Sequence, residues 1–569
     1  MPATIKPVLT GNPDIDGLLE VNKWAVQSLS FGFPTAGSAY SGDYAAGGEP
    51  SKNFAALTAA QQDAARAVLA SIASVANLSF TEMTGAAAGK ADLRIGRTDG
   101  TLAGHAYTPS AHPAGGDVWF ARSGDFALAA APVAGSYAFA AMLHEIGHAV
   151  GLKHGHQAYT VAVNGAARPT MSAAHDSMEY SVMTYRSYVG GPANVYSNEA
   201  AGFAQTLMMY DIAALQHLYG ANYASNAGNS VYGWNPATGE MSLNGAGQGA
   251  PAGNRIFMTI WDGGGVDTYS FAKYTTDVTV DLRPGEWSTA STAQLAKLGV
   301  GEVAHGNIAN ALLYKGDARS LIENAEGGSG NDRLSGNDAA NALDGGDGND
   351  LLDGKRGGDV LTGGAGNDIF IVDHAGDRLG EAAGGGTDTV RSSVSFSLVR
   401  SQIEHLQLTG RADADAGGNG LANRLTGNGG ANLLSGDAGN DAIAAGAGAD
   451  GLFGGAGSDR LTGGTGADSF HFDAVLGRTN VDQILDFGTD DTIRLDRDIF
   501  GAIAADGTLA RSLFRLGSVA ADRDDRILYD EASGKLFYDA DGNGAGAAKL
   551  FAQLAPGTDL TNADFVAYI

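Results

Sequence analysis

The chain contains no cysteine, and only 14 of its 569 residues are proline. Without cysteine it can form neither a disulfide framework nor a thiolate metal site, so any extracellular stability has to come from packing or bound metal. The low proline content excludes collagen and proline-rich disorder. Glycine, at 85 residues, is about twice as frequent as usual, which indicates many tight turns.

Basic residues and long apolar runs are also scarce. The chain has 35 basic against 63 acidic residues, a formal net charge of −28. This balance argues against nucleic acid or an anionic membrane as a partner and favours bound cations. Residues 1–18 carry one lysine and no apolar core of a Sec signal peptide, and the most apolar stretch, 126–143, is interrupted by Pro132 and Gly135. We therefore expect no membrane span.

Helix signals concentrate in the first ~220 residues, as in an α+β domain. The segment 58–78 opens with a capping box made by Thr58 and Gln61, and further helices are expected at 136–152 and at 203–219, where Gly220 follows. The next stretch instead contains short β-prone runs separated by Gly and Asp turns. These runs cover residues 255–261, 266–271 and 278–282.

Beyond Glu323 the sequence repeats with a step of nine. Five copies (327–371) and six copies (418–471) match the pattern G-G-x-G-x-D-x-U-x, where U is a large apolar residue. Gly and Asn allow turns with positive φ, and the x-U-x strands are expected to stack in parallel into a right-handed β-roll. A flexible linker is the alternative, but linkers have no reason to keep a nine-residue phase. The U positions are Leu334, Leu343, Leu352, Leu361, Phe370, Leu425, Leu434, Ile443, Leu452, Leu461 and Phe470.

One large apolar side chain in nine residues makes a thin core, and stacked carboxylates repel one another without a cation. Calcium, which takes 6 to 8 oxygen ligands, would supply the missing free energy. Copies with Asn341, Asn423 or Asn432 at the sixth position should bind it more weakly. The expected calcium ligands are Asp332, Asp350, Asp359, Asp368, Asp441, Asp450, Asp459 and Asp468.

The segment HEIGHAVGLKH, residues 144–154, contains the candidate metal ligands and the candidate catalytic base. His144 and His148 are four residues apart, which places them about 40° apart on one helix face, as two ligands of a zinc ion require. A continuing helix would carry His154 out of reach, so we expect Gly151 to end the helix and fold His154 back. Glu145 lies beside these ligands and can act as a base toward a water molecule. Ordinary surface histidines would form this pattern by accident in about one such chain in 10⁴.

With these residues identified, the pattern resembles the metzincin zinc peptidases, and nearly the whole chain resembles their serralysin branch. The likeness extends to Ser181–Tyr185, which looks like a Met-turn, and to the nonapeptide array. The resemblance implies that Met183 forms an apolar floor under the zinc. It also implies that Tyr185 is a possible fifth zinc ligand that stabilises an oxyanion. A purely structural aromatic is the alternative for Tyr185.

The resemblance also covers a substrate-binding strand. In this family the segment like 116–120 forms an edge strand along which the peptide substrate pairs. An ordinary strand of the sheet is the alternative. The residues concerned are Gly116, Asp117, Val118, Trp119 and Phe120.

The expected domains follow from these features. The first segment resembles a propeptide that blocks the cleft, with a disordered terminus as the alternative, and the acidic-then-apolar residues Asp564–Ile569 resemble a type I secretion signal. The order is a propeptide-like segment at 1–18, a catalytic domain at 19–221, a β connector at 222–324, a β-roll at 325–475 with an interruption at 372–417, and a β cap with the secretion signal at 476–569.

The expected protein is thus an α+β metzincin domain followed by an all-β parallel β-roll. As a function we expect a secreted, monomeric zinc endopeptidase with one catalytic zinc and several structural calcium ions, which acts on proteins or peptides and is exported by a type I apparatus. A calcium-dependent surface or adhesion protein with an inert amino-terminal domain is the alternative. An exported lipase or lyase is a third possibility, but the chain has no G-x-S-x-G elbow.

Overall fold

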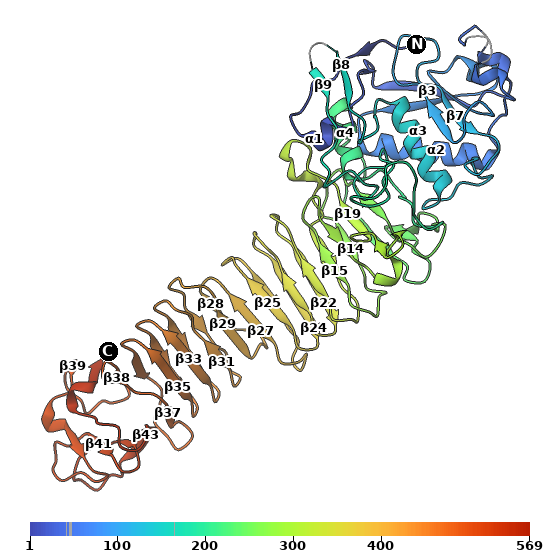
Figure 1. The fold of residues 1–569 in the computed structure, drawn as a ribbon. Helices are drawn as coiled ribbons and strands as arrows, with labels where there is room; N and C mark the ends of the chain where they lie inside the picture. Colours follow the sequence, from blue (N-terminus) through green and yellow to red (C-terminus); the bar gives the residue numbers. More distant parts are fainter. Residues whose placement is uncertain (41, 45–47, 164–165) are drawn as a thin grey trace. The chain divides into compact units, whose positions relative to one another are not determined.

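The computed structural model describes residues 1–40, 42–44, 48–163 and 166–569, and it divides into two compact units (Figure 1). The first unit comprises residues 1–329 and 335–339, and the second comprises 330–334 and 340–569. All four α-helices of the described residues belong to the first unit, whereas the second unit is built from strands, turns and short 3-10 helices.

The first unit contains a five-stranded sheet in the order β4-β3-β5-β7-β6. Four of these strands are parallel, and the short strand β6 runs antiparallel to β7 at one edge. The sheet therefore ends at β6, and this edge strand contacts helix α3 (Tyr137–Ala149). The strands are β3 (Ser28–Gly32), β4 (Ser79–Met83), β5 (Leu93–Thr98), β6 (Gly104–Ala106) and β7 (Val118–Ala121).

Two helices pack beside this sheet, as Figure 1 shows. Helix α2 (Ala59–Val75) begins with the predicted capping box, in which Thr58 and Gln61 exchange hydrogen bonds. Helix α3 (Tyr137–Ala149) is capped by Ser136 and is followed by Gly151 at φ +108°. Both predicted helices are confirmed, and their apolar faces join one continuous core.

The third predicted helix begins later than expected. Helix α4 spans Met209–Tyr219 and ends at Gly220 with φ +87°, but residues 203–208 are not helical. Asp211 accepts a hydrogen bond from the backbone N–H of Met208, which caps the helix there. The preceding residues are held elsewhere, because Gln205 donates its N–H to Phe257 O.

The remainder of the first unit is rich in β-structure, as predicted. The three β-prone runs contain β13 (Met258–Ile260), β14 (Thr268–Ser270) and β15 (Thr279–Asp281). Strand β13 pairs with β19 (Ile308–Asn310), and β14 pairs with β10 (Val231–Trp234), both in parallel. The amino-terminal segment adds α1 (Pro13–Asp16) and a pair between β1 (Thr4–Ile5) and β2 (Lys23–Trp24).

Most of the second unit is a parallel β-roll with 18 residues, or two nonapeptides, per turn, and antiparallel strand pairs lie near its carboxyl end. Leu343 pairs with Leu361, and Ile443 pairs with Leu461. All eleven U side chains are at most 1% exposed, so they form the narrow core of the roll. The repeat strands include β22 (Ala342–Asp347), β23 (Leu351–Asp353), β24 (Val360–Ala365), β25 (Ile369–Val372), β31 (Arg424–Thr426), β32 (Leu433–Ser435), β33 (Ala442–Ala447), β34 (Gly451–Phe453), β35 (Arg460–Thr465) and β36 (Ser469–Phe472).

The roll continues through residues 372–417, where the nonapeptide pattern is interrupted. Strands β27 (Thr389–Ser392) and β29 (His405–Leu408) lie between β25 and β31, and all neighbours are parallel. Buried Val390 and Leu406 occupy the positions that the repeats give to their U residues. At the carboxyl end, β44 (Phe565–Tyr568) pairs with β38 (Thr492–Asp496).

The predicted fold class, an α+β domain followed by a parallel β-roll, is confirmed. Across the described residues, every helix is too short or too polar to span a bilayer.

Candidate metal and catalytic site

The three predicted zinc ligands converge on one point. The Nε2 atoms of His144 and His154 are 3.0 Å apart, and the Nε2 of His148 lies 3.2 Å from that of His144 and 3.0 Å from that of His154. Three nitrogens bound at about 2.1 Å to one tetrahedral ion would be separated by about 3.4 Å. Their spacing therefore fits a single metal ion, and these side chains can hold one.

The opposite nitrogens of two rings fix the tautomers. His144 Nδ1 lies 2.8 Å from Val182 O, and His148 Nδ1 lies 2.8 Å from Leu152 O. A carbonyl oxygen only accepts, so each Nδ1 carries the proton and each Nε2 presents a lone pair. Lone pairs that face one another repel, and a cation at the centre removes this repulsion.

The turn after α3 brings His154 back toward the helix. The backbone N–H of Leu152 donates to Gly147 O, and Gly151 adopts the positive φ that was expected of it. Because the chain reverses here, a residue ten positions after His144 lies beside it. The local geometry is thus the one that the sequence predicted, and it depends on a glycine at position 151.

The segment Ser181–Tyr185, which resembles a Met-turn, contacts the helix that carries His144 and His148. Met183 is fully buried, and a Cβ built on Gly147 would lie 2.9 Å from its Sδ. Asp211 anchors this turn, because its carboxylate accepts hydrogen bonds from the Ser181 hydroxyl and from the Val182 N–H. Sequence reasoning missed Asp211, since only the fold brings α4 to the turn.

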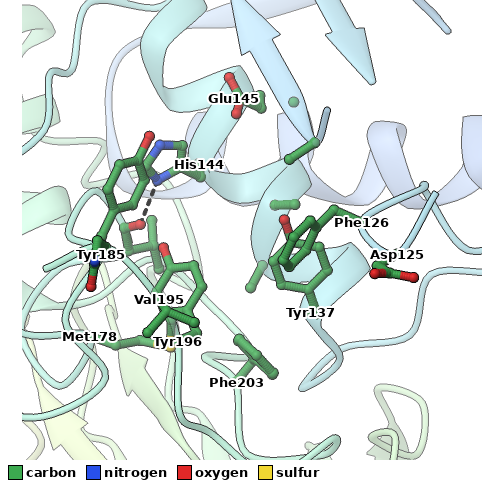
Figure 2. A pocket seen from close by; sticks show the side chains of 16 residues that line it. Asp125, Phe126, Tyr137, His144, Glu145, Met178, Tyr185, Val195, Tyr196 and Phe203 are labelled. Atoms are coloured by element: carbon green, nitrogen blue, oxygen red, sulfur yellow. Dashed lines mark hydrogen bonds between the residues drawn. The ribbon is translucent and has the colours of Figure 1, made fainter. Parts of the chain in front are cut away.

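Glu145 lies at a cavity of about 390 Å³ beside the histidines (Figure 2). The cavity is also lined by His144 and Tyr185, and it extends between aromatic side chains of α3 and of the segment after the Met-turn. A peptide side chain has room there next to the carboxylate. The aromatic lining residues are Phe126, Tyr137, Tyr196 and Phe203.

Tyr185 faces two of the three converging histidines. Its ring centroid lies 4.5 Å from that of His154 and 5.5 Å from that of His144. Burial raises its pKa to about 12, so the phenol keeps its proton at neutral pH. His156 stacks on His154 at 5.3 Å without joining the three converging nitrogens, which fits a supporting position.

Burial sets the protonation of the site. It lowers the pKa of His144 to about 4 and that of His154 to about 3, and it lowers the pKa of His148 well below the usual range. All three imidazoles are therefore neutral at pH 7 and can bind a metal. Burial also raises the pKa of Glu145 to about 8, and a cation beside it would lower that pKa again.

The expectation that 116–120 forms an edge strand is wrong. Strand β7 has neighbours on both sides, β5 and β6, and Val118, Trp119 and Phe120 are buried. Asp117 is also buried and binds the Arg94 guanidinium through both carboxylate oxygens. The segment is therefore an inner strand with no free edge for a substrate, and Gly116 turns into it with φ +85°.

The edge strands of the sheet are β4 and β6, and β6 is the one beside Glu145. A Cβ built on Gly104 would lie 2.5 Å from Glu145 Oε1, so this strand runs directly beside the carboxylate. Ala103 and Gly104 line the cavity. Sequence reasoning missed β6 because a three-residue strand gives too short a pattern to recognise.

In most of the repeat aspartates, one carboxylate oxygen accepts a hydrogen bond and the other has no partner among the described residues. In each stack, Oδ1 accepts the backbone N–H of the residue 18 positions earlier, as Asp350 does for Asp332 at 2.7 Å and Asp459 for Asp441 at 2.8 Å. The second oxygen, Oδ2, is buried and has no hydrogen-bond partner in the described chain for seven of the eight predicted residues. Such oxygens are suited to bind cations. They belong to Asp350, Asp359, Asp368, Asp441, Asp450, Asp459 and Asp468.

The interruption contributes carboxylates that the repeat pattern did not predict. Asp388 continues the stack, because it accepts the N–H of Asp368 at 2.8 Å. Oxygens of Asp368, Glu381 and Asp388 lie within 4.8 Å of one another, and each residue has one buried oxygen without a partner among the described residues. This group can also hold a cation, and only the folded stack brings its members together.

The first 18 residues do not line the cavity. They pack elsewhere in the first unit, where Asp14 accepts hydrogen bonds from Ser172 and His175 and Leu18 is fully buried. The segment therefore packs outside the cavity, and its last residues, Gly17 and Leu18, contact Lys153 beside His154. Its assignment as a propeptide remains a prediction.

Comparisons with known proteins agree with this architecture. Residues 51–167 match the matrixin model of peptidase M10, residues 221–413 match the M10 serralysin C-terminal model, and residues 417–452 and 452–474 match the RTX calcium-binding nonapeptide repeat. The chain is 32% identical to metalloprotease AprA of Pseudomonas entomophila over 330 residues, which is 57% of this chain and 62% of the relative. It is 31% identical to serralysin of Proteus mirabilis over 298 residues, 50% and 55% of the two chains.

The fold and the site define a matrixin-type domain that is followed by a calcium-repeat β-roll. The two M10 models match separate parts of the chain, about a fifth and about a third of its length, and in these parts the chain is similar to the serralysin branch of the peptidase M10 family. The matched region spans a little more than half of the length of these relatives.

Proposed function

We propose that this protein is a zinc-dependent endopeptidase that cleaves protein or peptide substrates outside the cell. The observation that carries this proposal is the convergence of three Nε2 lone pairs beside the Glu145 carboxylate, at a cavity large enough for a substrate side chain. Three imidazole ligands suit zinc and leave a fourth position open.

The reaction is hydrolysis of a peptide bond. A zinc ion held by His144, His148 and His154 supplies Lewis-acid polarisation of the water and of the substrate carbonyl. Glu145 takes the proton of the attacking water and then delivers it to the leaving amine. The Tyr185 phenol, which stays protonated, donates a hydrogen bond to the carbonyl oxygen as its negative charge develops.

The substrate binds along β6 in this proposal. An extended peptide pairs with the free edge at Gly104–Ala106, so backbone hydrogen bonds hold it beside Glu145. One substrate side chain enters the aromatic-lined cavity. Pairing through the backbone tolerates many sequences, which favours broad specificity.

Several calcium ions complete the β-roll. Their ligands are the unpartnered Oδ2 atoms of the repeat aspartates, and the ions remove the repulsion within each stack. This need for calcium supports export, since calcium is plentiful outside cells and scarce in the cytosol. We propose a monomer that leaves the cell through a type I apparatus, with its export signal near Asp564–Ile569.

The change Glu145→Gln tests this function. It removes the base while it keeps the size of the side chain, so peptide cleavage by zinc-loaded protein should fall by at least about 10²-fold. Zinc content should be unchanged, because Glu145 is not a ligand. The control is Glu82→Gln, a carboxylate paired with Arg66 at the surface. Full activity of folded, zinc-loaded Glu145→Gln protein would overturn the proposal.

A further inference from the structure

Lys153, which directly precedes His154, is fully buried. Its ammonium lies within hydrogen-bond distance of the carbonyl oxygens of Gly17 (2.5 Å), Gln157 (2.6 Å), Pro169 (3.0 Å) and His154 (3.2 Å). Burying a lysine charge is costly unless its N–H groups are bonded. Backbone carbonyls satisfy this one, and they come from three separate parts of the chain.

Those carbonyls join the amino-terminal segment to the turn that carries the third histidine. We call residues 17–20 the N-terminal brace and residues 151–157 the His154 turn. The N–H of Lys153 donates to Leu18 O at 2.9 Å, and the N–H of Glu20 donates to Gly151 O at 3.0 Å. Leu19 forms a bridge with Leu152 between these two bonds. The brace therefore pairs with the turn like a short strand.

The paired residues determine where two histidines point. Leu152 O, which accepts the hydrogen bond from His148 Nδ1, belongs to the residue that bridges to Leu19. His154 follows Lys153, whose main chain and side chain are both bonded to the brace. A shift of the brace would therefore move the orienting carbonyl and the third ligand together.

The region leaves little room for such a shift. A Cβ built on Gly17 would lie 2.4 Å from Met171 N, and one built on Gly155 would lie 2.5 Å from Met171 Sδ. Met171 N also donates to Gly155 O at 2.9 Å. The brace and the His154 turn are thus both in close contact with Met171.

We propose that Lys153 is a positioning residue for the metal site, and that the N-terminal brace is a permanent part of that site. The lysine ties the brace to the His154 turn, so that the second and third histidines are held in place before metal binds. This inference rests on the proposed function, because it requires that the three histidines bind zinc.

The variant Lys153→Met tests the positioning role. It keeps the length and apolar stem of the side chain and removes the ammonium. We expect the folded, metal-free variant to bind zinc about 10- to 100-fold more weakly, as measured by competition with a chelator. The control is Lys23→Met, which also removes an ammonium that donates to a backbone carbonyl, that of Leu218. Zinc affinity of this control should be unchanged.

Different results would contradict the proposed function and the positioning role of Lys153. If wild-type protein binds no zinc, the proposed function fails. If wild type binds zinc and folded Lys153→Met protein binds it equally well, the function stands and the positioning role is wrong. A lower free energy of unfolding alone, with zinc affinity unchanged, would assign Lys153 a structural role only.

Hydrogen exchange in the wild-type protein provides a test that needs no variant. By reciprocity, a brace that positions the ligands must itself be stabilised when zinc binds. We expect zinc to slow exchange of the Lys153 and Glu20 amides by at least about 10-fold. The control amide is that of Thr268, bonded to Ser230 O between other strands of the unit. Unchanged Glu20 and Lys153 amides in zinc-loaded protein would overturn the inference.

Discussion

At the scale of single residues, backbone carbonyls orient the metal-binding rings. Val182 O and Leu152 O hold the protonated nitrogens of His144 and His148, which leaves both Nε2 atoms free for a metal. Each carbonyl belongs to a turn that is fixed from elsewhere in the fold. The Met-turn is fixed by Asp211, and the His154 turn is fixed by the amino-terminal residues. The geometry of the ligands therefore depends on residues that never touch the metal.

The first prediction concerns Asp211. Replacement by Ala leaves three buried donors unsatisfied, namely the Ser181 hydroxyl and the N–H groups of Val182 and Met208. We expect the free energy of unfolding to fall by about 2–4 kcal/mol in urea titrations. Asp63→Ala is the control, because that carboxylate is exposed at the surface. Equal stability of Asp211→Ala and wild type would show that the Met-turn does not need this anchor.

The second prediction concerns Tyr185. Replacement by Phe removes a single hydroxyl from the cavity and keeps the stacked ring, so zinc binding should be nearly unchanged. We expect kcat for a peptide substrate to fall by about 10²-fold with little change in KM, because the lost hydrogen bond forms only as charge develops. Tyr180→Phe, which alters a ring that packs on His175, is the control. An unchanged kcat would remove Tyr185 from the mechanism.

At the scale of elements, the sequence correctly predicted those features of helices and strands that depend on neighbouring residues. The capping box of α2, the end of α3 just before Gly151 and the burial of all eleven U residues follow from neighbouring residues and from a nine-residue period. The start of α4 was predicted six residues too early, because the apolar pattern of 203–208 serves contacts outside the helix. Nothing local in the sequence indicates those contacts.

The order of the strands in the sheet could not be predicted from local sequence patterns. An edge position was assigned to 116–120, whereas the edge strand beside Glu145 is β6, because strand order depends on pairing between distant segments. The interruption of the roll was a break in sequence but not in structure. Val390 and Leu406 continue the core without the glycine-rich motif, since stacking on the previous turn already fixes their backbone.

The third prediction concerns the pH dependence of the calcium-free roll. Burial and neighbouring carboxylates raise the pKa of Asp350 and of Asp441 to about 7, above the usual value of about 4. The folded roll thus binds more protons than the unfolded chain between about pH 4 and pH 7, and its stability falls as pH rises through that window. Protein in a calcium chelator should melt at a higher temperature at pH 5 than at pH 8.

Calcium should reverse this trend, because it binds the ionised carboxylates. The measurement is thermal unfolding followed by circular dichroism at pH 5 and pH 8, with chelator and with calcium, at one ionic strength. A chelated sample that is more stable at pH 8 than at pH 5 would contradict the assignment of these aspartates as unsatisfied in the absence of calcium.

At the scale of the whole molecule, the proposed function assigns two metals to two separate purposes in the two units. The histidine site can hold a cation for chemistry, and its surroundings form a large apolar core. The β-roll can bind cations for stability, because its narrow core is flanked by buried carboxylates with unpartnered oxygens. The zinc motif and the repeats occupy different halves of the chain, so the sequence alone predicted separate sites for the two metals.

The fourth prediction follows from this separation. A zinc-selective chelator should abolish peptide cleavage with little loss of β-sheet signal, and added zinc should restore activity. A calcium-selective chelator should instead speed hydrogen exchange across residues 340–569 by orders of magnitude, because the roll loses its bound cations. If calcium removal left exchange in the roll unchanged, the repeats would not depend on the ion.

The most direct test of the central claim is anomalous scattering at the zinc edge from crystals of the zinc-loaded protein. We expect one strong peak in the first unit, about 2.1 Å from the Nε2 atoms of His144, His148 and His154. A peak bound by other residues, or density in which the three rings point apart without a metal, would contradict the account.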